Sequence, residues 1–132
     1  MHETEVKILD IDVDAVHQRL RCIGAVLAYE TDIDTRFFHS PYHPGTTVIR
    51  ARAINSATEM TIKIQHGDDR QIKVRDEHVV MSDASLDQVT DWYCALGYQP
   101  VRWSHKHRTS YTRDHLHFEI DTFPGIPSFL EI

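Results

Sequence analysis

Polar and apolar residues alternate along much of this chain, and an alternation with a period of two predicts β-strands. It is clearest in three segments, at 47–54, 59–65 and 70–81. In the first, Arg50 and Arg52 fall on one face, and isoleucine and alanine residues fall on the other. Short polar stretches separate the segments and have the composition of hairpin turns. The middle of the chain is therefore predicted to form an antiparallel meander.

Strands are also predicted towards both ends of the chain. They cover 3–11, 25–38, 98–114 and 115–123, and the closing residues GIPSFLEI form a loop and the start of a last strand. In the N-terminal strand, two carboxylates and an ammonium share one face, and apolar residues share the other. These charged residues are Glu3, Glu5 and Lys7.

Two segments change to the helical period of 3.6 residues. The first covers 13–23, follows Asp12 and ends at Gly24. The second follows Ser85 and ends at Gly97. Aspartate and serine are good N-caps, and glycine after the last turn is a common stop. Both helices are therefore predicted from their ends as well as from their period.

The predicted elements follow one another in the order β-α-β-β-β-β-α-β-β-β. This order predicts an α+β protein with a mainly antiparallel sheet and two helices. Neither a GxGxxG nor a GxxxxGK[ST] phosphate loop occurs, so a parallel nucleotide-binding fold is not indicated. We expect both tryptophans, Trp92 and Trp103, to lie in the core.

The composition narrows the possible functions. The chain has 132 residues and 41% hydrophobic residues, which suits one globular domain. Its net charge of -6 does not favour nucleic acid as a partner. No apolar run approaches the roughly 20 residues that cross a membrane. The two cysteines have no metal-binding or disulfide spacing, and a reduced, cytoplasmic setting fits them best.

Charged residues recur on one face of nearly every predicted strand. A solvated sheet face accounts for any one strand, and that is our interpretation of Lys73. The recurrence of paired arginines and paired carboxylates instead favours a polar interior. In such an interior, Arg and Lys would bind phosphate, and carboxylates would hold a hard divalent cation. A polyphosphate with its metal ion is the ligand that such an interior fits.

This pattern resembles the signature of the CYTH domain family, also called the triphosphate tunnel metalloenzymes. The matching motifs are an ExExK strand, an RxR strand, a lone lysine, an RxE strand, a KxR strand, a strand ending in Asp and a final Glu after a Gly- and Pro-containing loop. In this chain they are Glu3, Glu5, Lys7, Arg50, Arg52, Lys63, Arg75, Glu77, Lys106, Arg108, Asp121 and Glu131. They occur in the family's order and span the chain nearly end to end.

The resemblance implies an α+β fold built on a mainly antiparallel β-barrel with two or more flanking helices. Residues 1–132 would form one such domain. The family usually continues with a second Glu, a helix and more strand, so we expect a barrel that is incomplete at the C-terminus. An open sheet edge invites pairing with another chain, and a homodimer would complete it.

The resemblance also implies a site. The residues that would bind the phosphate groups are Lys7, Arg50, Arg52, Lys63, Arg75, Lys106 and Arg108. The residues that would hold Mg²⁺ or Mn²⁺ are Glu3, Glu5, Asp121 and Glu131, with Glu77 and Glu119 as further candidates for the site. Those that would take part in catalysis are Glu5, Lys7 and Lys63. Catalysis there would rest on positioning and on neutralising phosphate charge.

One residue departs from the family pattern near the predicted site. The usual DTYF after the first helix appears as DTRFF, so Arg36 replaces an aromatic hydroxyl. A mechanism that needs this tyrosine is therefore not supported by the sequence. Arg36 is instead a candidate for an additional phosphate contact.

Three functions remain open. The first is a metal-dependent enzyme that hydrolyses inorganic triphosphate, a nucleoside triphosphate or thiamine triphosphate. The second is a class IV adenylate cyclase, which converts ATP to cyclic AMP and pyrophosphate. The third is a non-catalytic module that binds a polyphosphate or nucleotide. The sequence favours the hydrolase, because it has phosphate-binding residues but no clear element that recognises a base.

Overall fold

The computed structural model describes residues 2–39, 42, 47–65 and 72–132, and the side chains of these residues except at 2–3 and 72–74. The strands are β1 (His2–Ile8), β2 (Val26–His39), β3 (Thr47–Ile54), β4 (Ala57–Gln65), β5 (Ile72–Ser82), β6 (Gln99–Arg113), β7 (Leu116–Thr122) and β8 (Phe129–Glu131). The helices are α1 (Val13–Cys22) and α2 (Leu86–Ala95). The predicted order of elements is confirmed. The predicted turn at 66–69 and most of the loop at 39–47 lie outside the described residues.

The strands pair antiparallel with their neighbours. The registers place β3 between β2 and β4, β4 beside β5, and β7 between β6 and β8. The hydrogen-bonded order is β1-β5-β4-β3-β2-β6-β7-β8, and the pairing of β1 with β8 closes it. The predicted α+β class and its antiparallel barrel topology are therefore confirmed. The expectation of an open sheet edge at β8 is wrong, because β8 pairs with both β7 and β1.

The chain divides into two compact units. The first consists of Met1–Thr4 and Ile33–His105, and so contains β3, β4, β5 and α2. The second consists of Glu5–Asp32 and Lys106–Ile132, and contains α1, β7 and β8. The long strands β2 and β6 contribute residues to both units.

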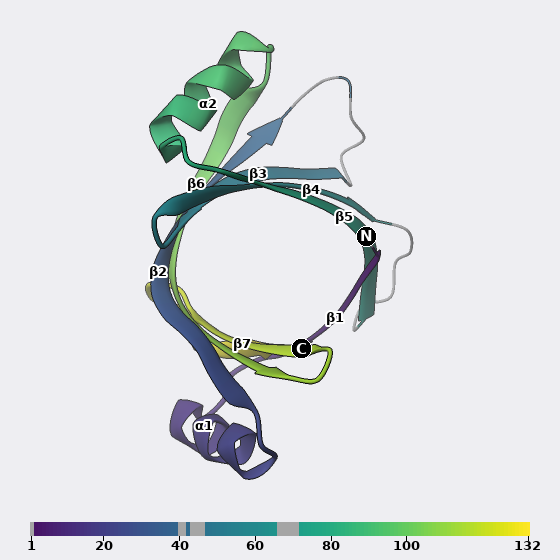
Figure 1. Cartoon of the computed structure of the whole chain (residues 1–132), viewed down its shortest axis with the longest axis vertical. Coiled ribbons are helices and arrows are strands. Elements are labelled where there is room, and N and C mark those ends of the chain that lie inside the picture. The colour runs from purple at the N-terminus through teal and green to yellow at the C-terminus, as the bar shows by residue number, and fades with distance from the viewer. Residues whose placement is uncertain (1, 40–41, 43–46, 66–71) are drawn as a thin grey trace. The chain divides into compact units, whose positions relative to one another are not determined.

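In the first unit, α2 covers the apolar face of the sheet (Figure 1). Ile49 and Ala51 of β3 pack with Phe38 of β2 against Val89 and Tyr93 of the helix. The rings of Phe38 and Tyr93 stack with centroids 4.6 Å apart. Burying each large apolar side chain here contributes about 1.5–3 kcal/mol. Alternation therefore directs the polar side chains of the same strands away from α2.

The second unit repeats this arrangement with α1. Leu20 of the helix lies in a buried cluster with Tyr111, Phe118, Ile120 and Leu130 of β6, β7 and β8. The opposite face of these three strands carries mostly polar residues, together with the buried ring of Phe129, which lies opposite Asp121 in the register. Each unit thus has one apolar face under a helix and one polar face.

The predicted helix caps are present. Asp12 accepts a hydrogen bond from the backbone of Ala15 and caps α1. Ser85 and Gln88 form a capping box at the start of α2. These side chains satisfy backbone N–H groups that the first turn of a helix leaves without partners.

The prediction that the tryptophans lie in the core is wrong. Trp92 is 54% exposed and Trp103 is 70% exposed. On α2 the next residue, Tyr93, takes the buried place against Phe38. On β6 the ring of Trp103 contacts the guanidinium of Arg36, 4.4 Å from the ring centroid. Trp103 therefore lies at the surface beside an arginine, outside the two buried clusters of the described residues.

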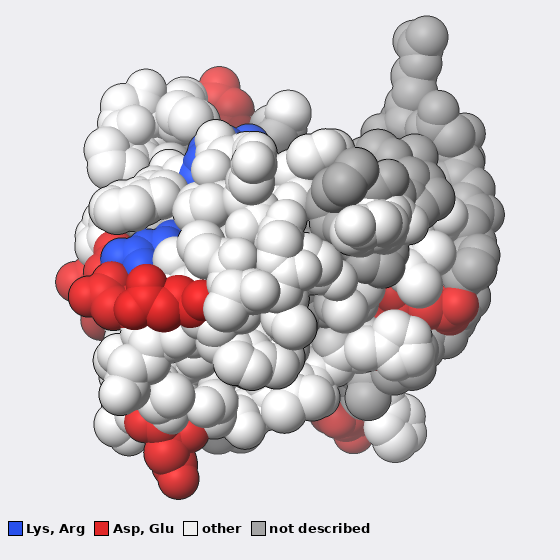
Figure 2. All heavy atoms as spheres, turned by 90° about the horizontal axis from the view of Figure 1, so that it is seen from above, with Lys and Arg blue, Asp and Glu red and all other residues white. Residues whose placement is uncertain are grey.

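The described surface carries little positive charge on the face shown in Figure 2, where acidic atoms cover more area than basic atoms. This agrees with the net charge of -6. None of the described helices has the length and apolar character that a membrane span requires.

Candidate functional site

The polar side of the first unit gathers charged residues from three strands. We call it the first polar face, and it comprises Thr35, Phe37, Arg50, Arg52, Glu59, Thr61, Lys63, Arg75 and Glu77. In the register, Arg52 lies opposite Glu59, and Lys63 lies opposite Glu77. Directly opposed residues in an antiparallel pair point to the same side. The structure therefore brings together four of the residues that the sequence assigned to phosphate binding: Arg50, Arg52, Lys63 and Arg75.

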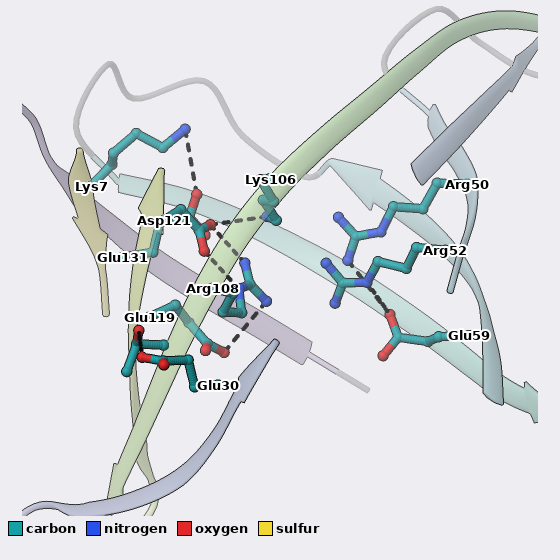
Figure 3. Close-up of polar contacts among 11 residues, drawn as sticks. Lys7, Glu30, Arg50, Arg52, Glu59, Lys106, Arg108, Glu119, Asp121 and Glu131 are labelled. Atoms are coloured by element: carbon teal, nitrogen blue, oxygen red, sulfur yellow. Dashed lines mark hydrogen bonds and ion pairs between the residues drawn. The ribbon is translucent and has the colours of Figure 1, made fainter. Parts of the chain in front are cut away.

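Glu59 is the centre of a cluster on this face (Figure 3). The Nε of Arg52 donates to its Oε1 at 2.7 Å, and the hydroxyl of Thr61 donates to the same oxygen at 3.1 Å. A terminal nitrogen of Arg50 lies 3.9 Å from that oxygen. Burial alone would raise the pKa of Glu59, but Arg52, Arg50 and Thr61 outweigh it and hold the pKa below its usual range.

The basic residues of this face are withdrawn from water. Arg52 is 7% exposed and Lys63 is 5% exposed. The Nε of Arg75 is buried and has no hydrogen-bond partner among the described residues. A solvated strand would expose its lysines and arginines, so that interpretation does not apply to Arg52 or Lys63. A buried guanidinium N–H without an acceptor is costly, and an anionic ligand would satisfy it.

The polar side of the second unit is built around Asp121. We call it the second polar face, and it comprises Glu5, Lys7, Lys106, Arg108, Glu119, Asp121 and Glu131. Arg108 donates to both oxygens of Asp121, each at 2.8 Å, and the Nζ of Lys106 donates to Oδ2 at 2.9 Å (Figure 3). The Asp121 side chain is 0% exposed.

The charges of this trio stabilise one another. Burial alone would raise the pKa of Asp121, but Arg108 and Lys106 outweigh it, so the pKa lies below the usual range. Burial would lower the pKa of Arg108, but Asp121 and Glu119 raise it further than that. Asp121 and Arg108 therefore form an ionised, buried pair, and the Nζ of Lys106 is a further donor to Asp121.

Two carboxylates lie side by side on the second polar face. Glu119 and Glu131 are direct partners in the register of β7 and β8. Glu119 Oε1 is 3.7 Å from Arg108, and Glu131 Oε1 is 3.4 Å from the Nζ of Lys7. The other oxygen of Glu119, Oε2, is buried without a hydrogen-bond partner among the described residues. Opposed like charges and a buried carboxylate oxygen without a donor both cost free energy.

This pair fits a divalent cation, which would relieve both costs. Magnesium is usually held by one or two carboxylates together with phosphate oxygens of a substrate. Among the described side chains, no group of three or more His, Cys, Asp or Glu residues is arranged to hold a metal ion by itself. A cation here would therefore depend on oxygen atoms of a ligand or of water.

The remaining predicted metal ligands are placed in different ways. Glu5 is half-buried on β1, and the side chain of Glu3 lies outside the described part of the chain. Both oxygens of Asp121 already accept hydrogen bonds from cations. The assignment of Glu3, Glu5, Asp121 and Glu131 to a metal stays a prediction.

Sequence reasoning missed Glu59. It lies at the start of the period-two segment 59–65 and has the same parity as Thr61 and Lys63, which is the signal that could have found it. It was overlooked because it belongs to no motif of the resemblance. In the structure it is the carboxylate that holds Arg52.

The expectation that Arg36 contacts phosphate is wrong. Its guanidinium donates to the hydroxyl of Thr90 at 2.8 Å and to Asp87 at 2.6 Å, and it lies over the ring of Trp103. Thr90 and Asp87 belong to α2, which covers the apolar face of the first unit. Arg36 therefore joins β2 to the helix, on the side opposite to Phe37.

Two histidines of β6 pair with aspartates of β2. His105 Nδ1 lies 2.6 Å from Asp34, and His107 Nδ1 lies 2.9 Å from Asp32. The hydrogen bond with Asp32 raises the pKa of His107. Burial opposes this rise, and the nearby charges of Glu30 and Asp32 add to it. Both histidines are exposed.

Asp32→Asn should return the pKa of His107 towards its ordinary value of 6.5. Because the folded pKa is raised, the stabilisation from this pair is fully present below the unfolded value and is lost as the pH rises through the folded value. The pair is largely solvated, so the loss should stay below about 1 kcal/mol. NMR titration of the histidine ring measures the pKa. Asp34→Asn is the matched control, and an equal shift of His107 in both variants would contradict the assignment.

The comparison with solved structures defines the class of fold. PH1012 protein from Pyrococcus horikoshii OT3 matches with a TM-score of 0.83 and 19% identity, covering 99% of this chain and 76% of that one. A putative adenylate cyclase from Vibrio parahaemolyticus matches with a TM-score of 0.78 and 18% identity, covering 98% and 73%. No protein-family model and no curated protein matches the sequence.

A third solved structure carries a more specific description. It is a putative adenylyl cyclase from Hippeastrum for which a dominant triphosphatase activity is described. It matches with a TM-score of 0.70 and 14% identity, covering 99% of this chain and 78% of that one. At these identities the likeness shows a shared fold. The recognition of the CYTH family in the sequence agrees with it.

Proposed function

We propose that this protein binds the triphosphate group of a small molecule on the first polar face and hydrolyses it with the help of Mg²⁺ or Mn²⁺. The observation that carries the proposal is the charge of that face. Among its described side chains, four cations share the face with two carboxylates: Arg50, Arg52, Lys63 and Arg75 with Glu59 and Glu77. All are buried or half-buried. The buried Nε of Arg75 has no acceptor among the described residues, and an anionic ligand would satisfy it.

The geometry of the arginines suits phosphate. A guanidinium donates two parallel N–H bonds, and phosphate accepts them with matching spacing. Glu59 binds Arg52 through Nε and so fixes the direction of its guanidinium before a ligand arrives. Such preorganisation supports catalysis, because the donors need not rearrange as charge develops on the transferred phosphoryl group.

On the second polar face, which belongs to the second unit, carboxylates are the metal ligands that the family resemblance implies. Glu131 and Glu119 would take part as the opposed pair, with Glu5 and Asp121 as the further ligands that the family resemblance implies. A bound Mg²⁺ or Mn²⁺ would supply neutralisation of phosphate charge. Lys63 on the first polar face and Glu5 and Lys7 on the second are the proposed catalytic residues, as the family resemblance implies.

An adenylate cyclase is the second candidate, and the name of the Vibrio parahaemolyticus structure favours it. The triphosphatase activity described for the Hippeastrum protein favours hydrolysis instead. A module that binds without turnover has the same charge requirement on the first polar face. The products formed from each substrate separate these three functions.

The purified protein should release orthophosphate from a triphosphate when Mg²⁺ or Mn²⁺ is present and lose this activity when the metal is chelated. ATP, inorganic triphosphate and thiamine triphosphate are tested separately, and products are resolved by chromatography. Glu5→Gln should lower turnover by about 100-fold, because it removes a proposed ligand charge. Asp14→Asn, an exposed change on α1, is the control and should retain full activity.

Each other result selects a different function. Cyclic AMP with pyrophosphate from ATP would establish the cyclase. Tight triphosphate binding without product would establish the binding module. No binding of any triphosphate would overturn the assignment of the first polar face, as would unchanged binding in an Arg50→Ala, Arg52→Ala double variant.

A further inference from the structure

Arg102 and the ring of Phe37, which belongs to the first polar face, form a cation–π pair. The guanidinium carbon of Arg102, on β6, lies 4.2 Å from the centroid of the Phe37 ring, on β2. Both residues belong to the first unit. Neither contributes to the buried apolar cluster under α2, which takes the neighbouring residue Phe38 instead. The function proposed above gives this pair no role.

The register places the pair next to a proposed phosphate-binding residue. Phe37 lies directly opposite Arg50, and Thr35 lies directly opposite Arg52. Directly opposed side chains start about 5 Å apart and point to the same face. A nucleoside triphosphate with its α-phosphate at Arg50 would therefore have its base, one ribose further along the molecule, near the Phe37 ring.

Exposure increases from the arginine cluster towards this pair. Thr35 and Arg52 are buried, Phe37 is half-buried, and Arg102 is exposed. A group bound beside Phe37 can thus enter from solvent, while the phosphates lie against the buried arginines. This polarity suits a ligand with a charged end and a flat, partly apolar end.

We propose that Phe37 and Arg102 form the subsite for the heteroaromatic base of a nucleoside triphosphate. The inference rests on the proposed function, since it takes the phosphates to be bound by Arg50 and Arg52. Bases stack on aromatic rings and on guanidinium planes, and such stacking tolerates different bases because each has a π-face. The exposed guanidinium of Arg102 supplies the surface for the base, and Phe37 supports it from behind.

This subsite distinguishes the three candidate substrates. Inorganic triphosphate has no ring and gains nothing from the pair. Thiamine triphosphate carries a positively charged thiazolium ring, which the guanidinium of Arg102 would repel. A neutral nucleobase has neither disadvantage, and a cation over its ring is attractive. The pair therefore favours a nucleoside triphosphate over both alternatives.

A second arginine–aromatic pair on the same two strands provides a matched control. Arg36 of β2 lies 4.4 Å from the ring centroid of Trp103 on β6. That pair is on the face covered by α2, because Arg36 also binds Thr90 of the helix. Changing Trp103 alters the same kind of contact without touching the first polar face.

The test compares ATP with inorganic triphosphate in the full-length protein, by kcat/KM with Mg²⁺ and by equilibrium binding. The variants are Phe37→Leu, Arg102→Gln and the control Trp103→Leu. Wild-type protein should prefer ATP. Phe37→Leu and Arg102→Gln should each lower kcat/KM and affinity for ATP about tenfold, while the values for inorganic triphosphate change less than about twofold. Trp103→Leu should leave the ratio of the two substrates unchanged.

The outcomes separate this inference from the function on which it rests. If Phe37→Leu and Arg102→Gln lowered the affinities for ATP and inorganic triphosphate to the same extent, the base subsite would be overturned. The proposal that the first polar face binds phosphate would remain. A wild-type preference for inorganic or thiamine triphosphate would do the same. If wild-type protein bound neither ATP nor inorganic triphosphate, the proposed function itself would be overturned. Binding without turnover still decides the subsite, because the affinity ratio is measured directly.

Discussion

Asp121→Asn should lower the free energy of unfolding by about 3–5 kcal/mol, the usual cost of removing one partner from a buried ion pair. The asparagine side chain is neutral, so Arg108 and Lys106 would remain buried with less compensation. The loss is measured by urea unfolding at neutral pH. Asp114→Asn is the control, since Asp114 is an exposed residue that pairs with Arg113 at 3.9 Å. It should cost less than about 1 kcal/mol.

The same variant should change the pH dependence of stability. The pKa of Asp121 is lowered in the folded protein, so its stabilisation is present above the ordinary carboxyl pKa and is lost as the pH falls through the folded value. Wild-type protein should therefore lose stability more steeply in acid than Asp121→Asn does. Equal stabilities of the two proteins at neutral pH would contradict the assigned network.

Arg52→Ala should lower kcat/KM for the preferred triphosphate by about 100-fold, which corresponds to about 2.7 kcal/mol of transition-state stabilisation. The alanine removes a buried cation that Glu59 holds in place. Arg52→Lys keeps the charge but cannot donate two parallel hydrogen bonds to phosphate. It should therefore retain more activity than alanine and less than wild type. Steady-state kinetics with saturating Mg²⁺ measures both variants.

A loss of folding must be separated from a loss of phosphate binding. Arg52→Ala leaves Glu59 with Arg50 at 3.9 Å and Thr61, so its unfolding is measured alongside its kinetics. Arg113→Ala, a half-exposed arginine at the end of β6, controls for loss of general positive charge. Activity of Arg52→Ala within twofold of wild type would remove Arg52 from the proposed site.

The elements of the fold could be predicted because each has a local cause. The segment 47–54 alternates around Arg50 and Arg52, and β3 has these same bounds. Asp12 and Ser85 start the helices through hydrogen bonds that span three residues. The burial of individual residues was less predictable. Trp92 and Tyr93 are adjacent aromatic residues on the predicted apolar stripe of the second helix. The way α2 packs on β3 buries Tyr93 and leaves Trp92 outside the cluster.

The candidate site was predictable in its members and less so in its contacts. The period of two within each strand places Arg50 and Arg52 on the same face and predicts the face of Lys63. The sequence pattern does not give the register between neighbouring strands. That register alone places Glu59 against Arg52 and Glu119 against Glu131. A sequence pattern therefore suggests which groups face inward, whereas pairing between strands determines which charges neutralise each other.

The positions of the two tryptophans make the protein's intrinsic fluorescence a probe of the first unit. Trp92 and Trp103 both belong to the first unit, and the second unit contributes none of the chain's two tryptophans. Indole emission during unfolding therefore follows the unit that carries Arg50 and Arg52. Far-ultraviolet circular dichroism instead detects the strands of both units. A transition that changes both signals therefore includes the unfolding of the first unit.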